Sequence, residues 1–100
     1  MSQLRGEATD ALFQAILSLR SEDECYAFFD DLCTIGELQA MTQRYHVARL
    51  LKEGLVYGEV GKRSGASSAT ISRVNRSLQY GSGGYKLILE RLERENEPSC

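Results

Sequence analysis

The sequence predicts an all-α protein of about six helices that carries a helix-turn-helix in its second half. Three observations support this fold class. A single proline, Pro98, leaves room for long helices. Apolar residues recur at the spacing of a helix face, and no alternating apolar stretch resembles a strand. Two short helical patterns also meet at a glycine-containing corner between residues 56 and 78, which is typical of a helix-turn-helix.

The first half of the chain predicts helices with large apolar faces. A helix is expected over residues 8–20, and the capping-box pattern of Ser21 and Glu24 starts a second one. Together they carry more apolar surface than one short bundle could readily cover. This favours burial against a second subunit, and a monomer with a dense core is the alternative. The large apolar side chains are those of Leu12, Phe13, Ile16, Leu17, Leu19, Tyr26, Phe28, Phe29 and Leu32.

Two further helices flank the helix-turn-helix. Thr34 and Glu37 repeat the capping-box pattern, and Gly54 is expected to stop the central helix that they start. The dimerisation helices are therefore expected over about residues 8–53. After the helix-turn-helix, the glycine-rich residues 80–85 predict a flexible joint, because they lack the lysine and preceding strand of a nucleotide-binding loop. The last helix carries an apolar row formed by Tyr85, Ile88, Leu89 and Leu92.

The helix-turn-helix itself is expected over about residues 56–78. Its first helix runs from about Tyr57 to Ser64, with Gly61 letting the second helix approach closely. Gly65 fits the left-handed position that ends a helix, and Ser67 can cap the next one. The second helix then points an apolar stripe inward, formed by Ala66, Ile71, Val74 and Leu78.

The outward side of this second helix is small and polar at its start and basic further along. Such a helix can enter the major groove of DNA, with serine hydroxyls and a short alanine at the base edges. An ordinary helical hairpin in a bundle is the alternative. The residues expected to read bases are Ser68, Ala69 and Ser72. The residues expected to contact phosphates are Lys62, Arg63, Arg73 and Arg76.

The charge of the chain is unevenly distributed. The net charge is −2, yet residues 44–76 contain seven Lys or Arg and two Glu, which gives +5. Residues 1–43 contain two Arg and eight Asp or Glu, which gives −6. A basic segment centred on the helix-turn-helix of an acidic protein is what a localised phosphate-binding face requires. Double-stranded DNA is therefore the expected partner.

The composition bounds the remaining classes of function. One hundred residues, 42% of them apolar, suit one compact domain over residues 1–100. No membrane span or signal peptide is recognisable, so we expect a cytoplasmic protein without a membrane partner. Cys25 and Cys33 are expected to be small, buried and reduced. His46 is the single histidine, and no catalytic set or metal-ligand spacing accompanies it, so neither an enzyme nor a metal site is expected.

Four groups of residues together form a recognisable pattern. They are Phe28-Phe29-Asp30-Asp31-Leu32-Cys33-Thr34; Gln43-Arg44 with Ala48-Arg49-Leu50-Leu51; Tyr57-Gly58-Glu59-Val60 through Ser67-Ser68-Ala69-Thr70-Ile71-Ser72-Arg73-Val74; and Tyr80-Gly81 with Gly83-Gly84-Tyr85. With this pattern the chain resembles the Trp repressor superfamily, most closely its YerC/YecD branch of Trp-repressor-related proteins, over about residues 10–92. The resemblance implies an all-helical, intertwined homodimer with two helix-turn-helix units that reach successive major grooves.

The resemblance also implies a frame for a small-molecule effector. The tryptophan-dependent repressor holds its ligand between two arginines, near a threonine and a serine. The matching positions here are Thr34, Arg44, Arg73 and Ser77. The position after the second arginine is a glycine in that repressor and Val74 in this chain, where a branched side chain would intrude on an indole. No cofactor is therefore expected, Val74 argues against tryptophan, and another small-molecule effector stays open.

These patterns predict a sequence-specific transcriptional regulator, expected to act as a repressor, that binds DNA as a homodimer. The alternative is a protein-interaction module that keeps the shape of a helix-turn-helix without reading DNA. The acidic residues Asp30 and Asp31 keep that alternative open.

Overall fold

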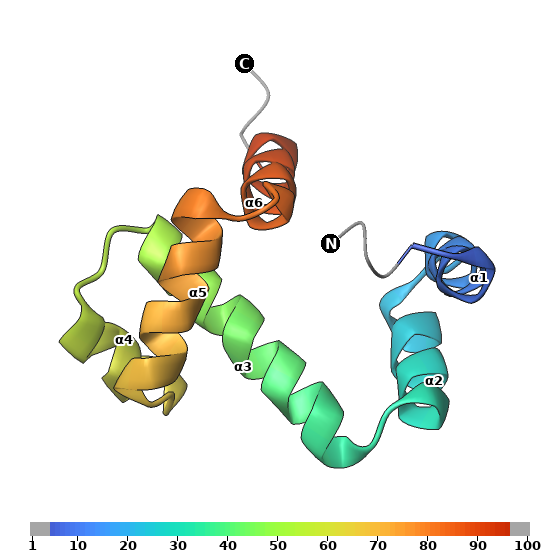
Figure 1. Ribbon diagram of the computed structural model, residues 1–100, viewed down its shortest axis with the longest axis horizontal. Coiled ribbons are helices and arrows are strands. Elements are labelled where there is room, and N and C mark those ends of the chain that lie inside the picture. Colours follow the sequence, from blue (N-terminus) through green and yellow to red (C-terminus); the bar gives the residue numbers. More distant parts are fainter. Residues whose placement is uncertain (1–4, 97–100) are drawn as a thin grey trace. The chain divides into compact units, whose positions relative to one another are not determined.

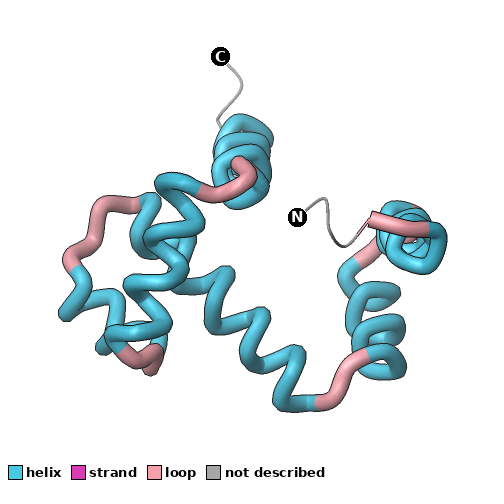
Figure 2. Tube along the Cα trace, viewed as in Figure 1, coloured by secondary structure: helices cyan, strands magenta, loops and turns pink. Residues whose placement is uncertain are grey.

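The computed structural model describes residues 5–96, and these residues form α-helices joined by short loops, with no strand among them (Figures 1 and 2). The all-α prediction with six helices is confirmed. The chain divides into two compact units, the first ending at Leu38 and the second beginning at Gln39. The helices are α1 (Glu7–Leu17), α2 (Glu22–Leu32), α3 (Ile35–Lys52), α4 (Tyr57–Ser64), α5 (Ser68–Tyr80) and α6 (Gly84–Glu95).

The helix α1 ends at Leu17, three residues before the predicted end. The backbone N–H groups of Ser18 and Leu19 donate to the carbonyls of Ala15 and Ile16, each at 3.1 Å, and so close a tighter last turn. The hydroxyl of Ser18 also donates to the carbonyl of Ala15 at 2.6 Å. A side chain that bonds to its own backbone competes with continuation of the helix. The apolar periodicity therefore extends beyond the helix that it predicts.

The helix α2 begins where the capping pattern places it. The hydroxyl of Ser21 accepts a hydrogen bond from the N–H of Glu24 at 3.1 Å. The Glu24 carboxylate accepts from the N–H of Arg20 at 2.8 Å, one residue earlier than in the standard capping box. Two N–H groups near the helix start are thereby satisfied. This predicted boundary is confirmed.

Neither α1 nor α2 buries a single residue. Phe28 and Phe29 meet edge to face with their ring centroids 5.6 Å apart, but both stay partly exposed. Leu17 is 84% exposed. The expectation that Cys25 and Cys33 are buried is wrong. Cys25 is exposed, and Cys33 is only partly buried.

The helix α3 has the full reciprocal cap that the sequence predicts. Thr34 Oγ1 accepts from the N–H of Glu37 at 3.1 Å, and Glu37 Oε1 accepts from the N–H of Thr34 at 2.8 Å. At the other end, Gly54 has a φ of 91°, in the left-handed region where glycine is favoured. The central helix and its two ends are confirmed.

The buried core lies entirely within the second unit. Four helices supply it, and each fully buried aliphatic side chain contributes about 1.5–3 kcal/mol through removal of its surface from water. Because α4 and α5 both contribute, this core fixes the helix-turn-helix. The buried side chains are Val47, Ala48 and Leu50 of α3, Val60 of α4, Ile71, Val74 and Leu78 of α5, and Leu89 of α6.

Two glycines of the loop between α5 and α6 occupy positions that disfavour a side chain. A Cβ built on Gly81 would collide with the carbonyl group of Ser77, reaching 3.1 Å from its carbon atom. Gly83 has a φ of 88°, where an L side chain is strained. Each of these glycines therefore meets a local geometric requirement, and the flexibility predicted for this loop stays a prediction.

Candidate DNA-binding surface

The corner between α4 and α5 is built by local hydrogen bonds. Gly65 has a φ of 71°, and its N–H donates to the carbonyl of Gly61 at 2.9 Å. The hydroxyl of Ser64 donates to the carbonyl of Val60 at 2.7 Å and accepts from the N–H of Ala66 at 3.1 Å. These bonds satisfy groups that the end of α4 would otherwise leave unpaired. The predicted left-handed glycine at the corner is confirmed.

The start of α5 is capped by Ser67. Its hydroxyl oxygen accepts from the N–H of Thr70 at 3.2 Å and lies 3.2 Å from the Thr70 hydroxyl. A capping serine fixes the direction in which the first turn leaves the corner. The predicted cap is confirmed, and the first turn of α5 begins at Ser68.

The close approach of the two helices predicts that any side chain at Gly61 would hold them apart, and this prediction is wrong for alanine. A Cβ at Gly61 would lie 3.7 Å from Ile71 Cδ1 and 3.8 Å from the Ala66 carbonyl oxygen, which are ordinary van der Waals distances. The helices approach closely enough to restrict a large side chain but leave room for a methyl group. The sequence indicates a small residue at position 61, but which side chains fit there depends on how Ile71 packs.

The two sides of α5 differ in burial. Ile71, Val74 and Leu78 point into the core, and Val74 is 3% exposed. The residues predicted to read bases, namely Ser68, Ala69 and Ser72, are all exposed. Arg73 and Arg76 are exposed on the same helix. The inward stripe is confirmed for Ile71, Val74 and Leu78, whereas the predicted fourth member, Ala66, precedes the cap of α5 and is only partly buried.

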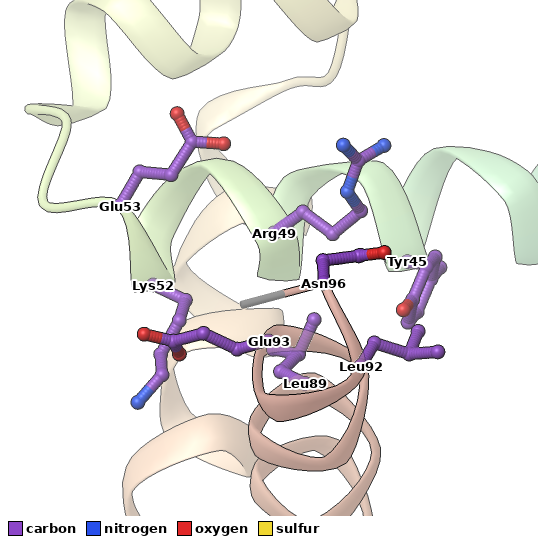
Figure 3. A pocket seen from close by; sticks show the side chains of 8 residues that line it. All are labelled: Tyr45, Arg49, Lys52, Glu53, Leu89, Leu92, Glu93 and Asn96. Carbon is purple, nitrogen blue, oxygen red and sulfur yellow. The ribbon is translucent and has the colours of Figure 1, made fainter. Parts of the chain in front are cut away.

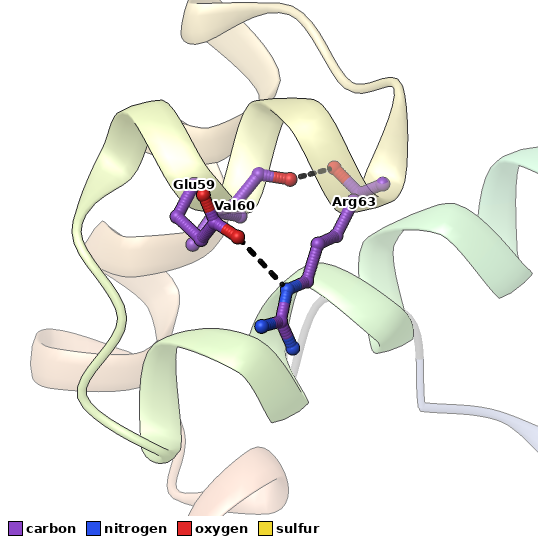
Figure 4. Close-up of polar contacts among 4 residues, drawn as sticks. Glu59, Val60 and Arg63 are labelled. Carbon is purple, nitrogen blue, oxygen red and sulfur yellow. Dashed lines mark hydrogen bonds and ion pairs between the residues drawn. The ribbon is translucent and has the colours of Figure 1, made fainter.

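The last turn of α4 supplies the other predicted phosphate contacts, Lys62 and Arg63, which are both exposed. Arg63 is not free: its Nε donates to Oε1 of Glu59 at 3.2 Å (Figure 4). This pair was not predicted, although an acidic and a basic residue four positions apart on a helix give a clear signal. The roles of the seven predicted base and phosphate contacts stay predictions.

A pocket of about 650 Å³ lies between α3 and α6 (Figure 3). The guanidinium of Arg49 and the carboxylate of Glu53 point away from α6 in this view. Charged groups that diverge do not form a compact site for one small charged ligand. The pocket is lined by Tyr45, Arg49, Lys52, Glu53, Leu89, Leu92, Glu93 and Asn96.

Comparison with known proteins decides the family. The sequence pattern of the family described as "Trp repressor protein" matches residues 7–93. The chain belongs to the Trp repressor family. It is 52% identical over 100 residues to the uncharacterized protein YerC of Bacillus subtilis strain 168, covering 99% of this chain and 96% of YerC. It is also 32% identical over 84 residues to the Trp operon repressor homolog of Chlamydia trachomatis serovar L2, covering 79% and 89% of the two chains.

Solved structures agree with this assignment. A candidate Trp repressor from Staphylococcus aureus superposes with a TM-score of 0.89 at 53% identity, over 92% of each chain. A TrpR-like protein from Eubacterium eligens superposes with a TM-score of 0.89 at 50% identity, over 93% of this chain and 96% of that one. The resemblance inferred from the sequence is thus confirmed for both family and fold.

The four residues predicted to form an effector site are divided between the two units of the chain. Thr34 belongs to the first unit, where its hydroxyl caps α3. Arg44, Arg73 and Ser77 belong to the second unit and are exposed. None of the four lines the pocket between α3 and α6. Their role as an effector site stays a prediction.

Residues 5–96 contain neither a candidate membrane span nor a candidate metal cluster. No helix in this range is both long and apolar enough to span a membrane. In the same range, no group of three or more His, Cys, Asp or Glu side chains is arranged to hold a metal ion.

Proposed function

We propose that the chain is a sequence-specific, DNA-binding transcriptional regulator that acts as a homodimer and represses by occluding promoter DNA. The observation that carries this proposal is the two-sided character of α5. One side is locked into the core by Ile71, Val74 and Leu78, and the other exposes hydroxyl and guanidinium groups. A rigidly held helix with a short polar start is what major-groove recognition needs.

The contacts divide into two kinds. The hydroxyls of Ser68 and Ser72 can exchange hydrogen bonds with base edges, and the methyl of Ala69 can meet a thymine methyl. The basic side chains Lys62, Arg63, Arg73 and Arg76 bind phosphates and set the register of the protein on the duplex. Arg49 and Lys52 of α3 are further candidates, although Lys52 already lies 4.0 Å from Glu90.

The homodimer is supported by the first unit. Helices α1 and α2 bury no residue and expose large apolar side chains, among them Leu17 and Tyr26. Exposed apolar surface on this scale is typical of a protein interface. A symmetric pair presents two reading helices, which would address half-sites about 34 Å apart. The Chlamydia relative is named a repressor homolog, which favours repression.

The proposed regulator does not use tryptophan. Val74 is buried in the core cluster with Ile71 and Leu78, so its branched side chain occupies space beneath the reading helix. The proposal predicts equal DNA affinity with and without tryptophan. A band-shift titration measures this, and a gain of tenfold or more on adding tryptophan would contradict the role of Val74. Equal affinity with and without tryptophan would still allow a different effector.

The salt dependence of DNA binding tests the proposed function. If the dimer neutralises six phosphates, log affinity falls with log salt concentration at a slope of about −5. Fluorescence anisotropy with a labelled duplex at several salt concentrations measures the slope. A slope near zero, or no binding at low salt, would favour the alternative of a protein-interaction module.

A further inference from the structure

In the pair formed by Glu59 and Arg63, Nε is the guanidinium atom that donates the hydrogen bond. Arg63 Nε donates to Glu59 Oε1 at 3.2 Å, across one turn of α4 (Figure 4). Within residues 5–96, neither Nη atom of Arg63 makes a hydrogen bond. Both side chains reach solvent, with 53% of Arg63 and 39% of Glu59 exposed.

The geometry of the guanidinium determines which of its donors remain available for a phosphate. The group is planar and carries five N–H donors in a rigid fork. With Nε held, the two Nη atoms keep a paired edge that matches two oxygens of one phosphate. A long side chain that is already restrained loses less conformational entropy when it binds. Glu59 can therefore prepare Arg63 for a phosphate.

The charge of Glu59 acts in the opposite direction. A carboxylate near DNA repels phosphates and lowers affinity at long range, with a strength that falls as salt is added. Restraint of Arg63 through a hydrogen bond requires only an oxygen acceptor at this position. The two effects can thus be separated by replacing the carboxylate with an amide, which keeps the acceptor and removes the charge.

We propose that Glu59 is a positioning residue for the DNA contact of Arg63: it holds Nε and leaves both Nη atoms to bind one phosphate oxygen pair. This inference rests on the proposed function. It assigns a role to an acidic residue in the otherwise basic stretch of residues 44–76. It also predicts that two uncharged replacements of Glu59 differ in DNA binding.

The test compares Glu59→Gln with Glu59→Ala in the full chain, using a labelled duplex obtained by sequence selection. Both variants remove the same charge, but only glutamine can still accept from Arg63 Nε. We expect Glu59→Gln to bind about threefold to fivefold more tightly than Glu59→Ala, a size set by two weak surface pairs per dimer. The ratio should stay constant with salt, because the two variants carry equal charge.

A double-mutant cycle isolates the pair. In an Arg63→Ala background the ratio of the two Glu59 variants should fall to about one, whereas in a Lys62→Ala background it should persist. Thermal unfolding of each variant checks that the fold is retained. Equal affinity of the two variants with Arg63 present, or a ratio that survives removal of Arg63, overturns the positioning role. Failure of the unaltered chain to bind any DNA instead contradicts the proposed function, and the positioning role with it.

Discussion

The two units of the chain differ in how many side chains they bury. The second unit closes a core of eight buried side chains from four helices, and every one of them lies between residues 47 and 89. The first unit has apolar faces on both helices and a side-chain cap at the start of α2, yet α1 and α2 bury nothing. Hydrogen-bonded caps define where a helix begins, whereas burial requires partners on the apolar side.

This difference separates two tasks. The unit with its own core holds the reading helix, so the helix-turn-helix is positioned by residues of one chain. The unit without a core carries the surface that we assign to the dimer. Binding affinity should therefore depend on both units, while the local geometry of α5 should depend only on the second.

The largest expected effect comes from a charge on the apolar face of the first unit. Leu17→Glu should dissociate the dimer, because a buried carboxylate without a partner is strongly disfavoured. Affinity for a two-half-site duplex should fall by at least about 100-fold, since linkage of two readers is lost. Analytical ultracentrifugation measures the mass. Val56→Glu, at an exposed apolar residue of the second unit, is the matched control and should remain dimeric.

The next effect tests the core of the second unit. Ile71→Ala should lower the free energy of unfolding by about 2–5 kcal/mol, because it removes buried methyl groups and leaves a cavity. Val56→Ala should change it by less than about 0.5 kcal/mol, because Val56 is 73% exposed. Urea unfolding followed by circular dichroism compares the two. Similar losses in both variants would contradict the burial of Ile71 in the core.

A smaller effect distinguishes the residues exposed on α5. Arg76→Ala should weaken binding to all duplexes alike and make the salt slope less steep by about two per dimer, through loss of one phosphate contact on each chain. Ser72→Ala should instead change the preference among sequences, with a size of about 1 kcal/mol at one position of each half-site. Competition binding with a panel of operator variants measures both. Interchanged behaviour would contradict the assignment of these two side chains.

The smallest effects come from two glycines. Gly61→Ala should raise stability by about 0.5–1 kcal/mol, because the added methyl fits against Ile71 and alanine is the better helix former. Gly81→Ala should lower it, because the methyl would overlap the Ser77 carbonyl. The two melting temperatures should therefore move in opposite directions. A loss of stability in Gly61→Ala would instead show that this position requires glycine.

Much of the fold could be predicted because its signals are local. The reciprocal bonds of Thr34 and Glu37, the cap at Ser67 and the bond of the left-handed Gly65 all join residues within four positions of one another. The inward stripe of α5 follows from helical spacing alone. Such features depend on the backbone geometry that the sequence encodes directly.

The features that were missed depend on packing or on competing bonds. The tolerance of Gly61 is set by the position of Ile71, which lies on another helix. The row predicted for α6 buries only Leu89, because burial depends on what covers each residue. The pocket between α3 and α6 joins residues more than thirty positions apart. The pair of Glu59 and Arg63 was recognisable from its spacing of four residues, whereas the net charge of a segment does not show which charges pair.

Sequence selection from random duplex DNA, at a stated salt concentration, tests the central claim most directly. The account predicts enrichment of a palindrome whose half-site centres are about 34 Å apart. It also predicts that Ser72→Ala enriches an altered half-site with the same spacing. Selection that returns no enriched palindrome from the folded chain would contradict the claim that α5 reads DNA.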